Sequence, residues 1–310
     1  MELDRRESLP TTLGIEKELR PSPCLINVKT LKEIYKAMKQ AADEAVTAEI
    51  STHHANAKDP ATAIAQVQND GDVPKFEDII KEYGRVGIII TGTNGERVVS
   101  YDEESLNEAN LPKPLQSVIM ETGLALRTLQ PPKQPRNRAN IIIDFTKPPL
   151  IDTTNPSEAP IQNGSSFYAF GESRSFVSGV YIAIEQTLER YKTWRGLLYK
   201  HHMYDILLIV LGFPFAIFLA TLFDSFLTSQ APDTLSHPLI IAVDVYVFLV
   251  AVYIFRISFG IVRWLYPYME EERNPNPAYV RFRLLVTAFI GVVFAAVIAV
   301  GIEKILQGTE

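Results

Sequence analysis

The chain has 310 residues, a formal net charge of −6 and a hydrophobic content of 47%, and its mean hydropathy of +0.05 averages two unlike parts. Residues 203–310 hold long uncharged runs, whereas residues 1–202 have the composition of an ordinary globular protein. Neither part has the clustered Lys/Arg excess that attracts phosphate backbones, so we expect no nucleic-acid partner.

The first 200 residues indicate a reducing compartment. Cys24 is the single cysteine, which excludes an intramolecular disulfide. Residues 1–14 have no apolar core and do not form a secretory signal. Because residues 1–25 contain three prolines and no periodicity, we expect a flexible leader there.

Helical and strand patterns then alternate. Apolar residues recur at helical spacing from Thr30 to Ser51, and Thr30 and Glu33 have the spacing of a capping box. A weakly alternating strand over Thr62–Val67 and a short helix over Phe76–Tyr83 follow.

A sheet is predicted over the rest of the globular part. Asn94-Gly95 favours a tight turn between Val86–Ile90 and Val98–Tyr101, which together form a hairpin. Further strands are expected over Leu115–Met120, Asn140–Phe145 and Ser166–Phe170. Residues 26–172 are therefore interpreted as an α+β domain, a mostly antiparallel sheet with two flanking helices.

A helix capped by Ser173 begins after the last strand. Its apolar stripe continues to Leu198, and residues 161–213 contain no proline. We expect an amphipathic stalk helix over 173–202 that enters the membrane without a break.

Three uncharged or nearly uncharged stretches complete the chain, at about 206–223, 238–256 and 284–302. Each is long enough to cross the hydrocarbon core of a bilayer. They predict an all-α membrane domain over 203–310. The connection over 224–237 has no Lys or Arg, while the flank before the first span and the connection between the second and third spans are rich in Lys and Arg. The positive-inside rule then predicts a cell-membrane protein with a cytoplasmic N-terminus and the C-terminus outside.

Asp244 is the sharpest anomaly, because an ionisable side chain within a span is costly to insert. One hypothesis is a polar contact across an oligomer axis, a pore lining or a proton site. The alternative is that the span starts later than Pro238, which would leave Asp244 among the outer headgroups.

Other residues of the membrane domain have two interpretations each. Arg256, Arg263 and Trp264 are candidate lipid-headgroup contacts, either by general snorkelling or by binding a specific anionic lipid. Gly212 and Pro214 predict a kink in the first span, which is common in membrane helices and is occasionally part of a gate.

No catalytic or metal-ligand spacing is recognisable, and the pairs His53-His54 and His201-His202 lack companion ligands. We therefore expect no cofactor, no metal and no enzymatic activity. The leading hypothesis is a sensor, adaptor or scaffold whose cytoplasmic domain binds a ligand or protein partner and is coupled to three membrane helices. One alternative is an oligomeric pore-forming or membrane-perturbing effector gated by the soluble domain, and another is a membrane-anchored enzyme. The expected partners are the lipid bilayer and either a protein partner or a second copy that associates through the membrane helices.

Overall fold

The computed structural model describes residues 14–57, 80–82, 84–128, 135–149, 163–200, 202–230, 237–272 and 277–307. The chain divides into two compact units. The sheet unit consists of Met1–Thr146 and Gly164–Lys192, and the helical unit consists of Lys147–Asn163 and Thr193–Glu310. The strand predicted over Thr62–Val67 and most of the helix predicted over Phe76–Tyr83 lie outside the described residues.

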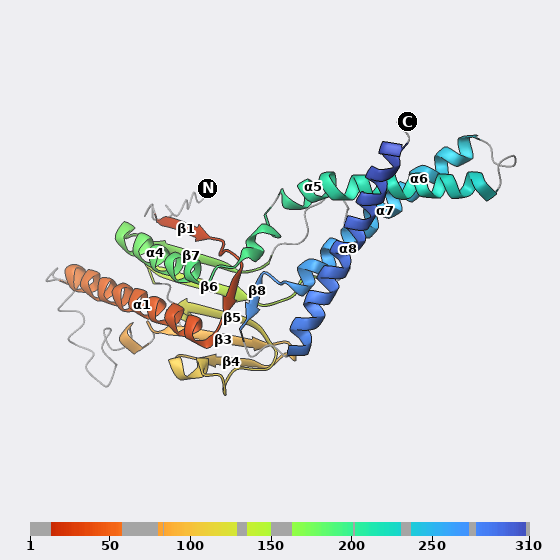
Figure 1. Cartoon of the computed structure of the whole chain (residues 1–310). Coiled ribbons are helices and arrows are strands. Elements are labelled where there is room, and N and C mark those ends of the chain that lie inside the picture. The colour runs from red at the N-terminus through yellow and green to blue at the C-terminus, as the bar shows by residue number, and fades with distance from the viewer. Residues whose placement is uncertain are drawn as a thin grey trace, which may run out of the picture. The chain divides into compact units, whose positions relative to one another are not determined.

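The sheet unit is built on a six-stranded antiparallel sheet (Figure 1). Each neighbouring pair of strands is antiparallel. The turn of the predicted hairpin contains Gly95 at a φ of +87°, a conformation that glycine adopts at low cost. The strands, in spatial order, are β1 (Ile15–Leu19), β7 (Ser166–Gly171), β6 (Arg138–Asp144), β5 (Leu115–Thr122), β3 (Val86–Gly92) and β4 (Arg97–Ser100).

Two helices cover one face of this sheet (Figure 1). Helix α1 (Val28–Ala57) packs against β3, β5 and β6, and helix α4 (Arg174–Arg190) packs against β1, β7 and α1. Alternate residues of β6 and β7 therefore point into a core that includes Ile141, Ile143 and Phe167, all fully buried. An antiparallel α+β fold and the predicted hairpin are thus confirmed.

The remaining elements of the sheet unit are short. Strand β2 (Cys24–Ile26) precedes α1, and two 3₁₀ turns, η1 (Glu103–Leu106) and η2 (Leu124–Thr128), lie in the connections between strands. Helix α1 begins two residues earlier than predicted. Its cap is Asn27, whose Oδ1 accepts a hydrogen bond of 2.8 Å from the Thr30 backbone N–H, so the expected capping box between Thr30 and Glu33 is wrong.

The flexible leader predicted over 1–25 is also wrong in its second half. Residues Ile15–Leu19 pair along their whole length with β7, and Cys24 and Ile26 are fully buried. The prediction failed because β1 is a charged edge strand (IEKEL) with no apolar face of its own. Its place is decided by the unpaired edge that β7 offers, which no local pattern in residues 15–19 encodes.

The continuous stalk helix predicted over 173–202 does not form. The Ser173 Oγ caps α4 as expected, but α4 ends at Arg190 and Thr193 has extended backbone. The reason is a competing pairing: the Leu25 N–H donates to the Tyr191 carbonyl at 3.3 Å, and Lys192 forms a β-bridge with Cys24. Backbone groups that would have continued the helix are used by the N-terminal segment instead.

Among its described residues, the helical unit contains three helices long and apolar enough to cross a membrane, over Met203–Phe226, Pro238–Leu265 and Tyr279–Ala296. The first consists of α5 (Met203–Leu207), a π-helical turn η4 (Leu208–Gly212) and α6 (Phe213–Gln230). The second and third spans belong to α7 (His237–Leu265) and α8 (Pro277–Gln307). The 3₁₀ turn η3 (Trp194–Leu197) precedes the first span, and the strand β8 (Met269–Glu271) lies between α7 and α8 in the chain.

Aromatic side chains pack the three spans against one another. Phe294 of α8 packs against Phe215 of α6 at 4.7 Å between ring centroids and against Phe255 of α7 at 5.5 Å. All three rings are buried in one cluster. Because lipid is as apolar as these side chains, their contribution comes from close packing rather than from removal of surface from water.

The burial of Cys24 generates a first prediction. Burial, aided by the nearby Glu189 carboxylate, raises the pKa of the thiol to about 12. At pH 8 only about one thiol in ten thousand would then be a thiolate, compared with roughly a quarter of ordinary cysteines. We expect a maleimide or iodoacetamide added to the native protein at pH 8 to leave Cys24 unmodified, as measured by intact mass. Rapid modification under native conditions would contradict this environment, and modification after denaturation is the control.

Candidate functional site

Four arginines are buried at one end of the helical unit, the end where the first span begins, the second ends and the third begins. Their exposed fractions lie between 5% and 9%, although a guanidinium group is always charged. We call this set the arginine layer. It comprises Arg195 in η3, Arg256 and Arg263 in α7, and Arg283 in α8.

A single carboxylate joins two members of the layer. Glu270 of β8 accepts a hydrogen bond from Arg283 Nη2 at 2.6 Å and forms an ion pair with Arg195 through its other oxygen. The three residues come from the segment before the first span, the connection between the second and third spans, and the start of the third span. Charge-assisted bonds of this kind are strong when shielded from water, so Glu270 ties these three segments together.

Tyrosine rings cover the remaining faces of the guanidinium groups. The ring of Tyr266 lies 4.6 Å from the Arg283 guanidinium and 5.9 Å from that of Arg195. Arg263 lies 4.3 Å from the ring of Tyr199, and Arg256 lies 6.0 Å from the ring of Tyr204. Cation–π contacts replace part of the hydration that the buried charges lose.

Tyr199 also closes the end of α7. Its hydroxyl lies 3.1 Å from the Arg263 carbonyl and 2.9 Å from the Tyr266 carbonyl, both of which belong to the last turn or just beyond it. These carbonyls have no partner within the helix. Burial raises the pKa of Tyr199 despite the opposing effect of Arg263, which keeps the hydroxyl protonated as a donor at neutral pH.

The residues singled out from the sequence fall in different places. Arg256 and Arg263 belong to the arginine layer, and their guanidinium groups lie against tyrosine rings. Trp264 is half-buried, and Lys147 Nζ lies 4.7 Å from its ring. Whether lipid headgroups reach these residues stays a prediction.

In the first span, the π-helical turn ends at Gly212, two residues before Pro214. A π turn is a common site of helix distortion, and the bend at Gly212 and Pro214 stays a prediction. Gly212 also permits close packing, because a Cβ there would lie 2.8 Å from the Leu208 side chain and 3.2 Å from the Phe255 ring.

Asp244 lies within α7, well away from the arginine layer, and is half-buried. Its Oδ1 is inaccessible to solvent and has no hydrogen-bond partner among the described residues. Across the residues that the structure describes, no group of three or more His, Cys, Asp or Glu side chains is placed to hold a metal ion.

Glu270, Arg283 and Tyr199 were not recognised as a site from the sequence. In the sequence, Arg195 and Arg283 are two of the arginines that flank the spans, and they indicate membrane orientation alone. The usable signal was the sequence between the second and third spans, where Tyr266, Tyr268 and three consecutive glutamates separate groups of arginines. Such a mixture is typical of a packed ionic cluster as well as of a solvated loop, so the pattern alone does not distinguish between these two structures.

Glu270 is expected to be essential for the stability of the helical unit. Glu270→Gln would leave two buried guanidinium groups without their shared counter-charge, a loss of about 3–5 kcal/mol. The thermal midpoint of the full chain in detergent should fall by many degrees, as measured by light scattering or circular dichroism. Glu272→Gln, at an exposed position two residues away, should change it little. Equal midpoints for the two variants would contradict a structural role for Glu270.

The chain matches no protein-family model, no curated protein and no solved structure.

Proposed function

We propose that the chain is a membrane-embedded sensor or adaptor whose sheet unit lies in the cytoplasm and binds a ligand or protein partner. Binding of this ligand or partner to the sheet unit alters the three apolar helices through residues 191–200. The observation that carries the proposal is the attachment of this connection to the helical unit at Arg195 and Tyr199.

The connection is short and is held firmly at its far end. Helix α4 ends at Arg190, and only two residues separate it from the first residue of the helical unit, Thr193. From there, Arg195 pairs with Glu270, and Tyr199 holds the end of α7. A displacement of the α4 end therefore acts on all three spans at once, which a loosely attached linker would not allow.

The distribution of charge supports the cytoplasmic orientation. The arginine layer lies at the end of the spans that is continuous with the sheet unit, and the described part of the opposite connection contains no Lys or Arg. Retention of Lys and Arg on the cytoplasmic side is the strongest known determinant of membrane orientation. The same orientation keeps the single thiol in a reducing compartment.

The binding role can be tested with the full chain in cells. A photo-crosslinking residue at Val99 on β4 or at Ile182 on α4, both exposed, should capture the same molecule in independent preparations. Leu285, exposed on α8, is the matched control and should return lipid only. The binding role is contradicted if neither position gives a specific adduct and the purified protein retains no small molecule.

Transmission can be tested with the captured partner and the tryptophan of the connection. In a Trp264→Phe background Trp194 is the only remaining tryptophan, and its ring packs against Tyr266. Adding the partner should shift the Trp194 emission in this background. The shift should disappear when Arg195→Gln is added, because the connection is then released from Glu270. An unchanged shift in the double variant would mean that the arginine layer transmits nothing.

Asp244 favours a second candidate function, an oligomeric pore gated by the sheet unit. Asp244 is only half-buried within one chain, and an ionisable side chain within a span is costly to insert, so a polar contact with a neighbouring copy would lower its free energy. Three spans cannot enclose an aqueous path alone, so this function requires several copies.

The pore predicts ring-shaped oligomers in detergent and a conductance in planar bilayers. Asp244→Asn should lower cation conductance several-fold, because a ring of negative charges at the axis would be lost. Tyr246→Phe, at a highly exposed position of the same helix, should leave it unchanged. A monomer or dimer that conducts nothing would remove this function.

A further inference from the structure

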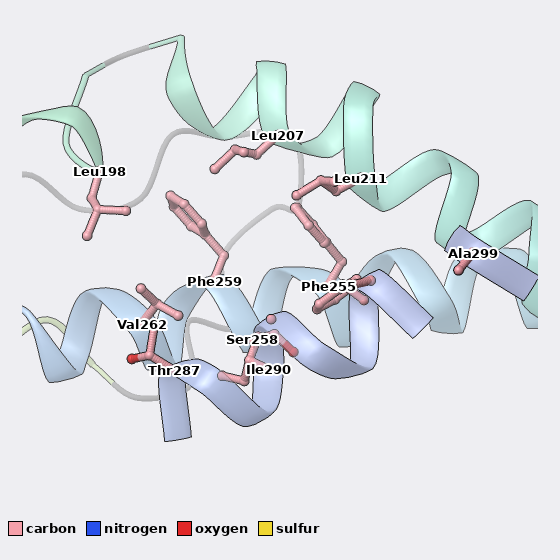
Figure 2. Close-up of a pocket in the computed structure, with 13 residues that line it drawn as sticks. Leu198, Leu207, Leu211, Phe255, Ser258, Phe259, Val262, Thr287, Ile290 and Ala299 are labelled. Carbon is pink, nitrogen blue, oxygen red and sulfur yellow. The ribbon is translucent and has the colours of Figure 1, made fainter. Parts of the chain in front are cut away.

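An apolar groove of about 590 Å³ runs along the helical unit (Figure 2). Its walls come from three segments: Leu207 and Leu211 of the first span, Phe255 and Phe259 of α7, and Thr287 and Ile290 of α8. Nearly every atom that lines it is carbon, and its volume is in the range of sites that bind small molecules. In a bilayer such a groove must be filled by lipid, by another helix or by an apolar ligand.

The dimensions of the groove fit a lipid chain. On α8 it extends from Thr287 to Ala299, which corresponds to about 18 Å at the helical rise per residue. Half of a bilayer's hydrocarbon core measures about 15 Å. The groove therefore begins one turn beyond Arg283 and is about as long as the hydrocarbon core of one leaflet is thick.

Both long walls of the groove end in an arginine. On α8, Arg283 lies one turn before Thr287, whose hydroxyl donates to the Arg283 carbonyl at 2.9 Å. On α7, Arg263 lies one turn after Phe259. Residues four apart share a helix face, so each wall leads from apolar side chains to the arginine layer.

The charge at this end of the groove favours an anion. The described residues 193–205 and 256–283, together with Lys147, contain seven Lys or Arg and four Asp or Glu side chains. Lys147 is exposed, and its Nζ lies 3.2 Å from the Tyr279 hydroxyl near the start of α8. Lysine, arginine and tyrosine at the level of the headgroups are the residues that bind phosphate there.

We propose that the groove holds an acyl chain of one anionic phospholipid, with its phosphate at the arginine layer beside Lys147. The lipid comes from the leaflet in which the arginine layer lies. This site requires only that the three apolar helices cross a bilayer, and it is independent of the partner and orientation proposed above. Bound there, the lipid would contact all three spans that Arg195, Glu270 and Arg283 connect.

Gly291 offers a way to block the groove without disturbing the fold. It lines the groove, and a Cβ added there would meet nothing within 4 Å. Gly291→Leu therefore places a side chain in open space, and loss of a glycine from a helix interior favours the helix. Val292→Leu is the matched control, because Val292 is 66% exposed and does not line the groove.

The test uses the full chain purified in detergent and native mass spectrometry with phosphatidylglycerol or phosphatidylcholine of equal chain length. We expect one retained phosphatidylglycerol per chain and about tenfold weaker retention of phosphatidylcholine, which lacks net charge. Gly291→Leu should weaken phosphatidylglycerol retention at least about tenfold, because leucine occupies the volume that the chain requires. Val292→Leu should behave like the unmodified protein.

Three results would overturn the proposal. Equal retention of the two lipids would show that no anion is selected. Undiminished phosphatidylglycerol retention in Gly291→Leu would place the lipid elsewhere. A dimer that is lost in Gly291→Leu, without loss of bound lipid, would show that the groove holds a helix of a second copy. Lys147→Gln adds a check on the headgroup, because it should reduce the preference for phosphatidylglycerol several-fold and leave phosphatidylcholine retention unchanged.

Discussion

The helical unit depends on how it accommodates four guanidinium groups that are almost completely removed from solvent. An isolated charge in such a place would be strongly destabilising, and an arginine cannot escape by losing its proton. The solution is shared neutralisation: Glu270 serves Arg195 and Arg283 together, while Tyr199, Tyr204 and Tyr266 offer their ring faces. The geometry requires the segment before the first span, the connection between the last two spans and the start of α8 to be correctly placed at the same time.

This constraint determines how the connection between the two units is attached. A continuous helix would transmit motion because it is rigid. The observed chain instead leaves α4 at Arg190 and is held again at Arg195 and Tyr199 by side-chain bonds. Bonds of this kind have discrete arrangements, so the same attachment can be stiff in one state and released in another. The proposed sensor role rests on this property more than on any feature of the sheet.

The groove is lined by the same three spans. The spans meet at the Phe215–Phe294–Phe255 contacts, while the groove extends toward the arginine layer. A lipid in the groove would contact the first span, α7 and α8, which the ionic cluster also connects. The proposed partner, the proposed lipid and the ion pairs would then act on one set of contacts, which is the physical condition for coupling between two binding events.

The sequence by itself determined the elements whose signals are local. Long uncharged runs identified three helices able to cross a membrane, Asn94-Gly95 identified the hairpin, and short apolar runs identified β5, β6 and β7, because each depends on the residues of one segment. Tertiary structure decided whatever depends on pairing between distant segments. The edge strand β1 exists because β7 has a free edge, α4 stops because Leu25 and Cys24 bind the backbone of Tyr191 and Lys192, and Glu270 gains its role from two arginines 75 and 13 residues away. Each of these contacts stabilises the fold only when two distant residues come together. The local sequence around either residue does not show that they will meet.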